Sequence, residues 1–307
     1  MTGRTAPLSA PGVAVGLVAL GLACQEVGAA IAVMLFPHTG PLGMVMLRLV
    51  FSAVILMAIA RPRLRGRTRG AWWSVARLGI ALAVMNGFFY LALERLALGV
   101  TVTIEVLGPL TLSILMARTR ASWVWAGTAL PGVVALGGGG WERLDPVGVA
   151  CALGAAVSWA FYIRGQARVG RDFPKLEGLA LAMAIGALLS LPFGVVAAGP
   201  VLLRPDFLAL GAAVAILSST IPYALELVAL RRLTEATFGV LMSLAPATAA
   251  LAGLVLLGQA LSWLEVVGLA LVMVASAGAV WTSRGRPDRD PVAEPVAWDR
   301  GAGRGRG

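Results

Sequence analysis

The sequence predicts an all-α polytopic membrane protein with ten transmembrane helices in two inverted five-helix repeats and with both termini in the cytoplasm. Three observations lead to this fold class. The 307 residues are 59% hydrophobic and only 13% charged, whereas a soluble chain carries about a quarter charged residues. Apolar runs of about 20 residues, the length that crosses a bilayer, recur from one end of the chain to the other. The basic residues fall in alternate connections between these runs.

Each apolar run is expected to form one helix, because a helix satisfies its own backbone hydrogen bonds inside lipid. The runs are rich in Gly and Ala, which let membrane helices approach one another closely. Both cysteines, Cys24 and Cys151, lie inside such runs and are expected to be small packing residues rather than a disulfide. In chain order, the predicted helices span residues 12–36, 43–60, 73–93, 98–117, 121–139, 147–164, 176–198, 207–228, 236–257 and 262–282.

The charges of the connections predict the orientation, because basic residues gather on the cytoplasmic side of membrane proteins. Of the 25 Arg and Lys residues, 21 lie before the first helix, in every second connection or after residue 283. Arg48 lies within a span, and the other connections contain only Arg95, Arg143 and Arg204. This split puts both termini in the cytoplasm and requires an even number of spans. The basic connections lie, in order, at 61–77, 118–120, 164–175 and 231–232.

The chain contains a weak internal repeat. Residues 92–109 and 229–246 are identical at six of 18 positions, and Pro109 aligns with Pro246 at this offset of 137 residues. The offset pairs the fourth helix with the ninth, and duplication of an odd number of helices inverts the second copy. Inverted halves are typical of secondary transporters, which bind substrate between them at the midplane. We therefore expect repeats at 12–139 and 147–282, followed by a disordered cytoplasmic tail at 283–307 that has little apolar surface to bury.

Polar side chains inside the predicted spans are candidates for function, because an ionised group at the bilayer centre costs about 2.5–3.5 kcal/mol on insertion scales. The alternative is a structural role in buried Arg–Glu pairs or in hydrogen bonds that fix helix packing. The candidates Asn86 and Tyr90 lie one helical turn apart, so both can face one cavity. The whole set is Glu26, Arg48, Asn86, Tyr90, Glu105 and Glu226.

Glu105 is the main candidate for a proton carrier. Its helix is predicted to begin near Leu98, which places Glu105 about 10 Å along the helix and away from the headgroups. Apolar surroundings disfavour the ionised carboxylate, which suits a group that binds and releases a proton. Pro109 cannot donate a hydrogen bond to the carbonyl of Glu105, so a bend is expected there. With Pro246 at the matching position, we expect both prolines to act as hinges, the alternative being kinks that serve only packing.

Arg48 is the one cation deep within a predicted span. Its guanidinium can bind a carboxylate through two parallel hydrogen bonds. The sequence leaves open whether that carboxylate belongs to a substrate, to Glu26 or to Glu105.

The eighth predicted helix carries a polar face that is expected to line a cavity. Residues at positions i, i+3, i+4 and i+7 lie on one face of a helix. This is the spacing of Ser219, Pro222, Tyr223 and Glu226. Glu226 lies near the cytoplasmic end of this helix, where pairing with a basic residue of the next connection is the alternative to a substrate contact.

Other classes of function lack support in the sequence. With one His, two Cys in apolar runs and no Gly-rich phosphate loop, we expect no enzyme, no cofactor, no metal site and no ATP-driven pump. The net charge of +10 comes without a basic face or a nucleic-acid-binding motif, so no nucleic acid is expected. Secondary transport of a small molecule remains.

Several stretches resemble the drug/metabolite transporter superfamily, EamA-type. The branch they resemble most includes the bacterial inner-membrane threonine/homoserine exporters. The resemblance covers residues 12–282 and implies ten helices in two inverted repeats, a multi-pass protein of the inner membrane, and export of small amino acids driven by the proton gradient. The stretches are LGVTVTIEVLGPL at 98–110, SSTIPYALE at 218–226 and GVLMSLAPA at 239–247, with QEVGAA at 25–30 and LRL at 47–49 less distinctive.

Two positions depart from the pattern that this resemblance implies. An acid is expected just before the proline of the second repeat, where this chain has Ala245. The pattern Leu-Gly-Glu is expected soon afterwards, where this chain has Gln259. The loss of two carboxylates leaves the substrate and the coupling ion open.

The sequence thus predicts a proton-coupled exporter of small amino acids or related metabolites that works by alternating access. Arg48 is expected to hold the substrate carboxylate, and Glu105 the coupling proton or the substrate ammonium, with Glu26 and Glu226 as additional candidates. The alternatives are an exporter of lipophilic cations or drug-like solutes, a membrane scaffold, and a membrane enzyme. The expected partners are a small-molecule substrate, protons and the bilayer, and a homo-oligomer is left open. The full predicted substrate site comprises Arg48, Asn86, Tyr90, Glu105 and Tyr223.

Overall fold

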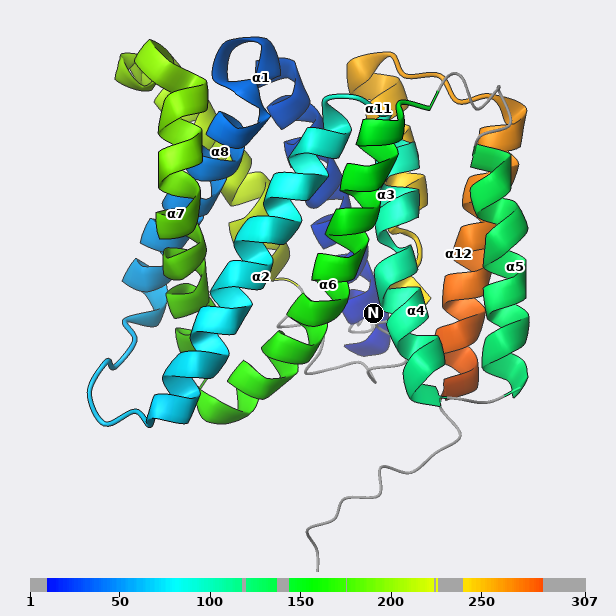
Figure 1. Cartoon of the computed structure of the whole chain (residues 1–307), viewed down its shortest axis with the longest axis horizontal. Helices are drawn as coiled ribbons and strands as arrows, with labels where there is room; N and C mark the ends of the chain where they lie inside the picture. Colours follow the sequence, from blue (N-terminus) through cyan, green and yellow to red (C-terminus); the bar gives the residue numbers. More distant parts are fainter. Residues whose placement is uncertain are drawn as a thin grey trace, which may run out of the picture.

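The computed structural model describes residues 10–117, 120–136, 144–174, 176–223, 225 and 240–283. Every regular element among these residues is a helix, and the helices stand side by side in one bundle (Figure 1). Eight are long and apolar enough to cross a membrane, and a shorter apolar helix spans Trp123–Leu136. The all-helical membrane class is therefore confirmed. The count of ten spans, the inverted repeats and the cytoplasmic termini stay predictions, and the tail after Ser283 lies outside the described residues.

The first element, α1 (Ala10–Ala60), joins two helices that the sequence predicts as separate. Gly40 departs from helical geometry with φ 64° and ψ 160°, a backbone conformation that glycine adopts without the clash of a Cβ atom. Pro37 and Pro41 flank it, and neither has an N–H to continue a regular helix. The predicted connection at 37–42 is therefore a sharp turn inside α1, visible at the top of Figure 1.

Other helices agree with the predicted ranges within a few residues, except that α6 is longer. The helix α6 (Pro146–Asp172) was expected to end at residue 164. It begins where the side chain of Asp145 accepts hydrogen bonds from the backbone N–H groups of Val147 and Gly148, with a proline in the first turn. The helices that agree are α2 (Arg69–Leu93), α5 (Arg120–Leu136), α7 (Glu177–Ala198) and α12 (Trp263–Ser283).

Two predicted helices are interrupted at equivalent positions. The helix expected at 98–117 consists of α3 (Leu98–Glu105) and α4 (Leu107–Ala117), which meet at Val106. The bend expected from Pro109 is present, because the carbonyl of Glu105 has no N–H partner four residues on. In the second interruption, a turn at Ser243 precedes α11 (Ala245–Leu257). Val106 and Ser243 are separated by the same 137 residues as the two prolines.

The helix expected at 207–228 is also irregular. The short 3-10 helix η2 (Gly199–Leu203) leads into α8 (Pro205–Ala215). A π-helical turn, η3 (Ile216–Thr220), follows α8, and helical structure continues to Tyr223. Turns of this kind inside membrane helices are frequent at functional sites. The predicted end of this helix, including Glu226, lies outside the described residues.

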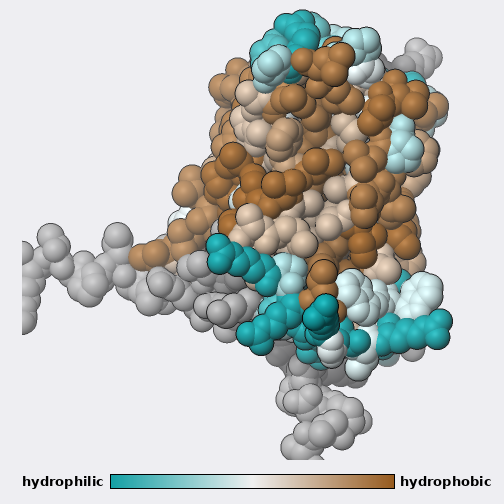
Figure 2. Space-filling view, turned by 90° about the vertical axis from the view of Figure 1, so that its left-hand side faces the viewer, coloured by the Kyte–Doolittle hydropathy of each residue, from teal (hydrophilic) through white to brown (hydrophobic). Residues whose placement is uncertain are grey.

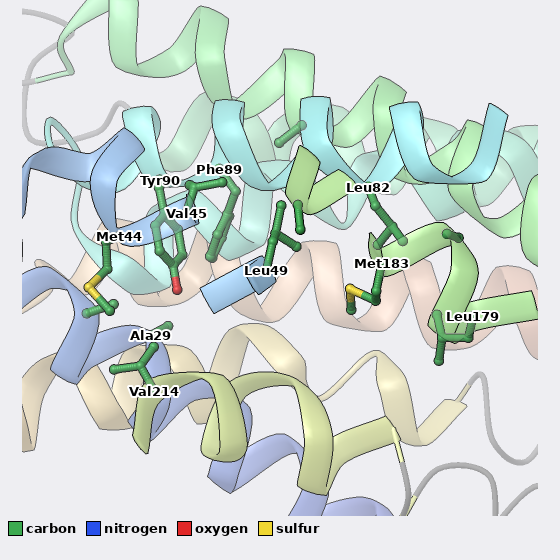
Figure 3. Close-up of a cluster of buried hydrophobic side chains, with 14 of the residues drawn as sticks. Ala29, Met44, Val45, Leu49, Leu82, Phe89, Tyr90, Leu179, Met183 and Val214 are labelled. Carbon is green, nitrogen blue, oxygen red and sulfur yellow. The ribbon is translucent and has the colours of Figure 1, made fainter. Parts of the chain in front are cut away.

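Small residues bring the helices into close contact. A Cβ atom at Gly28 would lie 2.8 Å from the Cβ of Ser218, and one at Gly99 would lie 2.9 Å from the Cα of Ala250. At Gly108 it would overlap the carbonyl oxygen of Ala156, so α4 touches α6 backbone to backbone. Between these contacts, buried side chains such as Leu49, Tyr90 and Met183 from α1, α2 and α7 form the core (Figure 3).

The outer surface is suited to a bilayer. Figure 2 shows an apolar belt around one face, with hydrophilic residues gathered above and below it. We call the end with the α1 turn and the first residues of α3, α6 and α12 the Gly40 end (top of Figure 1). The opposite end, where α1 stops and α2 begins, is the Arg69 end.

An ion pair lies at each end of the bundle, exposed at the Gly40 end and partly buried at the Arg69 end. At the Gly40 end, Arg95 donates to Asp145 across 2.8 Å, and this hydrogen bond holds the pKa of Asp145 below its usual value of 3.8. At the Arg69 end, Arg67 pairs with Glu177 across 2.7 Å and joins the start of α7 to the connection before α2.

Candidate functional site

A cavity of about 650 Å³ lies inside the bundle. Its lining extends from the middle of α1 to Phe173 and Leu176 at the Arg69 end, and it stops short of the Gly40 end. Five of the polar residues singled out by sequence line it, although they come from four different parts of the chain. These are Glu26, Arg48, Asn86, Glu105 and Tyr223.

The two arms of α1 supply one acid and the base. Glu26 is 1% exposed, and its Oε2 atom has no hydrogen-bond partner. Arg48 is 7% exposed and lies on the arm that follows the Gly40 turn. Glu26 is near enough to both Arg48 and Glu105 for their charges to act on it. The turn at Gly40 thus brings charges 22 positions apart into one cavity.

Arg48 is held by neutral groups rather than by a carboxylate. Its Nε donates to Oγ of Ser219 across 3.0 Å, and one terminal nitrogen donates to the carbonyl of Ser218 across 2.9 Å. The other terminal nitrogen donates to the hydroxyl of Tyr90 across 3.3 Å, and the guanidinium lies 5.6 Å from the centre of that ring. Among the described residues, no ion pair joins Arg48 to Glu26 or Glu105, so the structural alternative of a buried Arg–Glu pair is absent from this conformation.

Glu105 is the last residue of α3, immediately before the break at Val106. Its side chain is partly exposed to the cavity and forms no ion pair with a described residue. Pro109 also lines the cavity, one turn further along. The carboxyl group of Glu105 and the proline that removes the helical partner of its backbone carbonyl therefore occupy the same stretch of wall.

Asn86 and Tyr90 take different places, although they lie one turn apart on α2. Asn86 lines the cavity, and its Nδ2 donates to the carbonyl of Leu82 across 2.8 Å. Tyr90 is fully buried between the rings of Phe36 and Phe89 and lies behind Arg48, outside the cavity lining. Tyr90 therefore supports the guanidinium of Arg48 in this structure.

The two departures from the expected pattern lie in different surroundings. Ala245 is 4% exposed and lines the cavity, so an acid here would enter the site. Gln259 lies outside the lining, and its Oε1 accepts a hydrogen bond from the backbone N–H of Leu98 across 2.9 Å. It satisfies a free donor in the first turn of α3. Pro246, the second predicted hinge, is buried beside Ala245 and outside the lining.

Sequence reasoning missed several polar residues of the cavity wall, among them Gln166 and Ser276. Gln166 lies on the part of α6 that was expected to be a connection, and Ser276 lies inside α12. The signal for Gln166 would have been the continuation of α6 beyond Arg164. A single serine in a membrane helix carries no such signal, because it usually bonds to a carbonyl of its own helix.

Comparison with known proteins adds three findings. The model of the EamA-like transporter family matches residues 146–281. The threonine/homoserine exporter RhtA of Salmonella typhimurium (strain SL1344) is 35% identical over 270 residues, which are 87% of this chain and 91% of the relative. RhtA of Escherichia coli (strain K12) is 36% identical over 267 residues, 86% and 90% of the two chains. One solved crystal structure, 20% identical, has a TM-score of 0.60 and covers 89% of this chain and 99% of its own, which supports the fold alone.

Proposed function

Because the chain belongs to the EamA-type drug/metabolite transporters, together with the threonine/homoserine exporters RhtA, we propose that it exports small amino acids across the bacterial inner membrane in exchange for protons. The observation that carries this proposal is the meeting of one base and two acids in a single cavity without an ion pair among them. A zwitterionic amino acid offers one carboxylate and one ammonium, the two charges that such a set complements.

Arg48 retains the capacity to bind the substrate carboxylate. A guanidinium has five N–H donors, and three of them are engaged by Ser219, Ser218 and Tyr90. The contacts hold its plane in a fixed orientation, which reduces the entropy lost when a ligand binds. Two donors remain for a carboxylate that approaches from the cavity.

The carboxyl group of Glu105 links the substrate to the proton gradient in this proposal. Without a cationic partner, a carboxyl group in the bundle is stabilised either by a proton or by a bound cation such as the substrate ammonium. Because one excludes the other, proton binding favours release of the substrate. Antiport requires at least one group that binds either the proton or the substrate, but not both at once.

The position of the cavity and the breaks in the helices support alternating access. With the predicted orientation, the Arg69 end faces the cytoplasm, and the cavity extends to that end. At the Gly40 end, Gly99 packs on Ala250 and Gln259 caps α3, so the bundle is closed there. We propose that the bends at Val106 and Ser243 change angle about Pro109 and Pro246 when the Gly40 end opens.

Counterflow in proteoliposomes tests the proposal. Vesicles that contain the purified protein are loaded with unlabelled threonine, homoserine or another small amino acid, and uptake of the labelled compound is followed with and without a pH gradient. We expect saturable uptake that the gradient accelerates. In Glu105→Gln, we expect counterflow to persist with a higher KM, because the amide pairs more weakly with the substrate ammonium, and the gradient to have no effect. Intact gradient drive in Glu105→Gln would show that the coupling proton lies elsewhere.

Export of lipophilic cations is the second candidate, because aromatic residues share the cavity wall with the two acids. Trp159, Tyr162 and Phe173 line the half nearer the Arg69 end. Such a transporter requires the carboxylates but not a guanidinium, so Arg48→Ala should leave cation efflux unchanged. Loss of amino-acid counterflow in the same variant supports the first proposal.

A further inference from the structure

Three buried polar atoms lack a hydrogen-bond partner among the described residues, and all three belong to side chains that line the cavity. They are Oε2 of Glu26, Oε1 of Gln166 and Oγ of Ser276. Buried polar atoms are almost always hydrogen-bonded in folded proteins. Their concentration in one cavity indicates a place where a polar ligand supplies the missing partners.

Ser276 differs from other buried serines in this chain. Ser158, Ser190 and Ser243 each donate to a carbonyl of their own helix at distances of 2.6–2.8 Å. This bond is the usual way in which a helix accommodates a hydroxyl group inside a membrane. Ser276 is 6% exposed and has no such bond, so its hydroxyl remains free to serve another molecule.

Gln166 and Ser276 lie on α6 and α12, in the later half of the chain. The base and the acids of the cavity, Arg48, Glu26 and Glu105, all lie before residue 106. The charged groups of the cavity therefore come from the earlier part of the chain, beside neutral ones such as Asn86, and the later part adds a neutral polar wall that includes Gln166 and Ser276. A ligand that spans the cavity meets both.

The chemistry of the neutral wall limits what it can recognise. An amide and a hydroxyl donate and accept hydrogen bonds without charge, so they suit a neutral polar group better than a second ion. The charged groups of an amino acid are already matched by Arg48 and Glu105. The polar feature that remains on the substrate is a hydroxyl group on its side chain.

We propose that Gln166 and Ser276 are specificity residues that hydrogen-bond the side-chain hydroxyl of a hydroxylated amino acid and so favour it over an isosteric amino acid without the hydroxyl. This inference rests on the proposed export of amino acids. Hydroxylated amino acids are the substrates that the names of the RhtA relatives give, and the new element is the assignment of the selection to these two residues.

The test uses pairs of substrates with nearly the same shape. Labelled threonine counterflow is measured in proteoliposomes of the full chain, with unlabelled threonine or valine, and homoserine or norvaline, as competitors. In the unaltered protein, the hydroxylated member of each pair should compete better. In Gln166→Leu and Ser276→Ala, the preference for the hydroxylated member should fall by about five- to tenfold, the usual effect of one lost hydrogen bond. The decrease should come from weaker binding of threonine, whereas the binding of valine should not change.

Three controls separate recognition from folding. Ser190→Ala removes a buried hydroxyl outside the cavity and should keep the preference, and Ser276→Thr retains a hydroxyl and should keep most of it. The response to a pH gradient should be unchanged in all variants. An unchanged threonine-to-valine ratio in both Gln166→Leu and Ser276→Ala, or an equal loss for both competitors, overturns the inference and leaves amino-acid export standing. If the unaltered protein shows no counterflow with any amino acid, the proposed function fails, and the inference falls with it.

Discussion

The Nε atom of Arg48 lies 3.0 Å from Oγ of Ser219, and this hydrogen bond joins α1 to the π-helical turn η3. A second bond from the same guanidinium reaches the carbonyl of Ser218, and Gly28 of the other α1 arm packs against Ser218. Both arms of α1 therefore meet η3 beside Arg48, the one cation among the described residues that line the cavity. The carbonyl of Ser218 has no N–H partner four residues on, because Pro222 stands there, and it accepts the hydrogen bond from Arg48 instead.

Arg48→Lys should abolish most amino-acid counterflow, because an ammonium lacks the planar fork that binds η3 and a carboxylate together. We expect a decrease of at least about tenfold, since hydrogen bonds to charged groups contribute roughly 1.5–3 kcal/mol each. Ser219→Ala removes one support of the guanidinium but none of the donors that face the substrate, so it should reduce counterflow less than Arg48→Lys does. Initial rates over a range of threonine concentrations provide the measurement, and equal losses in both variants would contradict a role for Arg48 in carboxylate binding.

Glu26→Gln should differ from Glu105→Gln. Glu26 is almost fully enclosed and has an unpartnered oxygen, whereas Glu105 lies at a helix break with its side chain partly exposed to the cavity. We therefore expect Glu26→Gln to keep both counterflow and gradient drive and to raise the thermal unfolding temperature, because a buried unpaired carboxylate costs free energy. Two measurements check these expectations: uptake driven by a pH gradient, and thermal unfolding monitored by tryptophan fluorescence. Loss of gradient drive in Glu26→Gln alone would transfer the coupling role to Glu26.

Pro109→Ala and Pro246→Ala should slow transport without weakening binding. Each change restores a backbone N–H that can bridge the adjoining break and straighten the helix. We expect the maximal rate to fall several-fold, the KM to stay nearly constant and the unfolding temperature to rise. Pro131→Ala, inside α5 and away from the cavity, is the matched control and should have little effect on the rate. Normal rates in both hinge variants would show that these bends serve packing only.

Introducing acids at Ala245 and Gln259 should have opposite outcomes. Ala245→Glu places a third carboxyl group in the cavity wall and should change both the pH dependence and the substrate range of counterflow. Gln259→Glu keeps an oxygen that can accept from Leu98 at the start of α3, outside the cavity, and should leave transport unchanged. Gln259→Ala should lower stability by about 1 kcal/mol through the lost hydrogen bond. pH profiles of counterflow for the three variants distinguish a site position from a capping position.

The ion pair between Arg95 and Asp145 predicts an acid-sensitive contribution to stability. The pKa of Asp145 is lowered in the folded protein, so its contribution is present above the usual aspartate value of 3.8 and is lost as the pH falls through the lower folded value. Asp145→Asn should lower the unfolding temperature at pH 7 and make no difference below this window. In a double-mutant cycle, Arg95→Gln added to Asp145→Asn should cost less than it does alone. Full additivity of the two changes would show that the pair contributes nothing.

Much of the cavity could be anticipated from the cost of placing charge in lipid. Glu26, Arg48 and Glu105 stand out because each interrupts an apolar run, and the structure brings all three into one cavity. The bend beside Pro109 follows directly from the missing N–H group. These features depend on local covalent chemistry and hydropathy, which a single sequence contains.

The remaining features depend on packing that no local pattern encodes. The arginines at 164, 168 and 171 end the apolar run, yet α6 continues past Gln166 to Asp172, because long arginine side chains can reach water while their helix remains intact. The direction of Tyr90, which lies behind Arg48 and outside the lining, is set by the rings of Phe36 and Phe89. The turn at Gly40 inside α1 likewise appears only when both arms are seen packed on one core.

The contact of Gly108 with the backbone of Ala156 provides a point about which α4 can rotate. Gly108 lies between the break at Val106 and Pro109, so α4 touches α6 at the point where its own backbone bends most easily. From this fulcrum to Ala117 the arm is about 14 Å long, and a change of about 20° in the bend displaces its far end by roughly 5 Å. In the alternating-access cycle proposed above, a change in this one bend would therefore move the Arg69 end of α4 by about that distance.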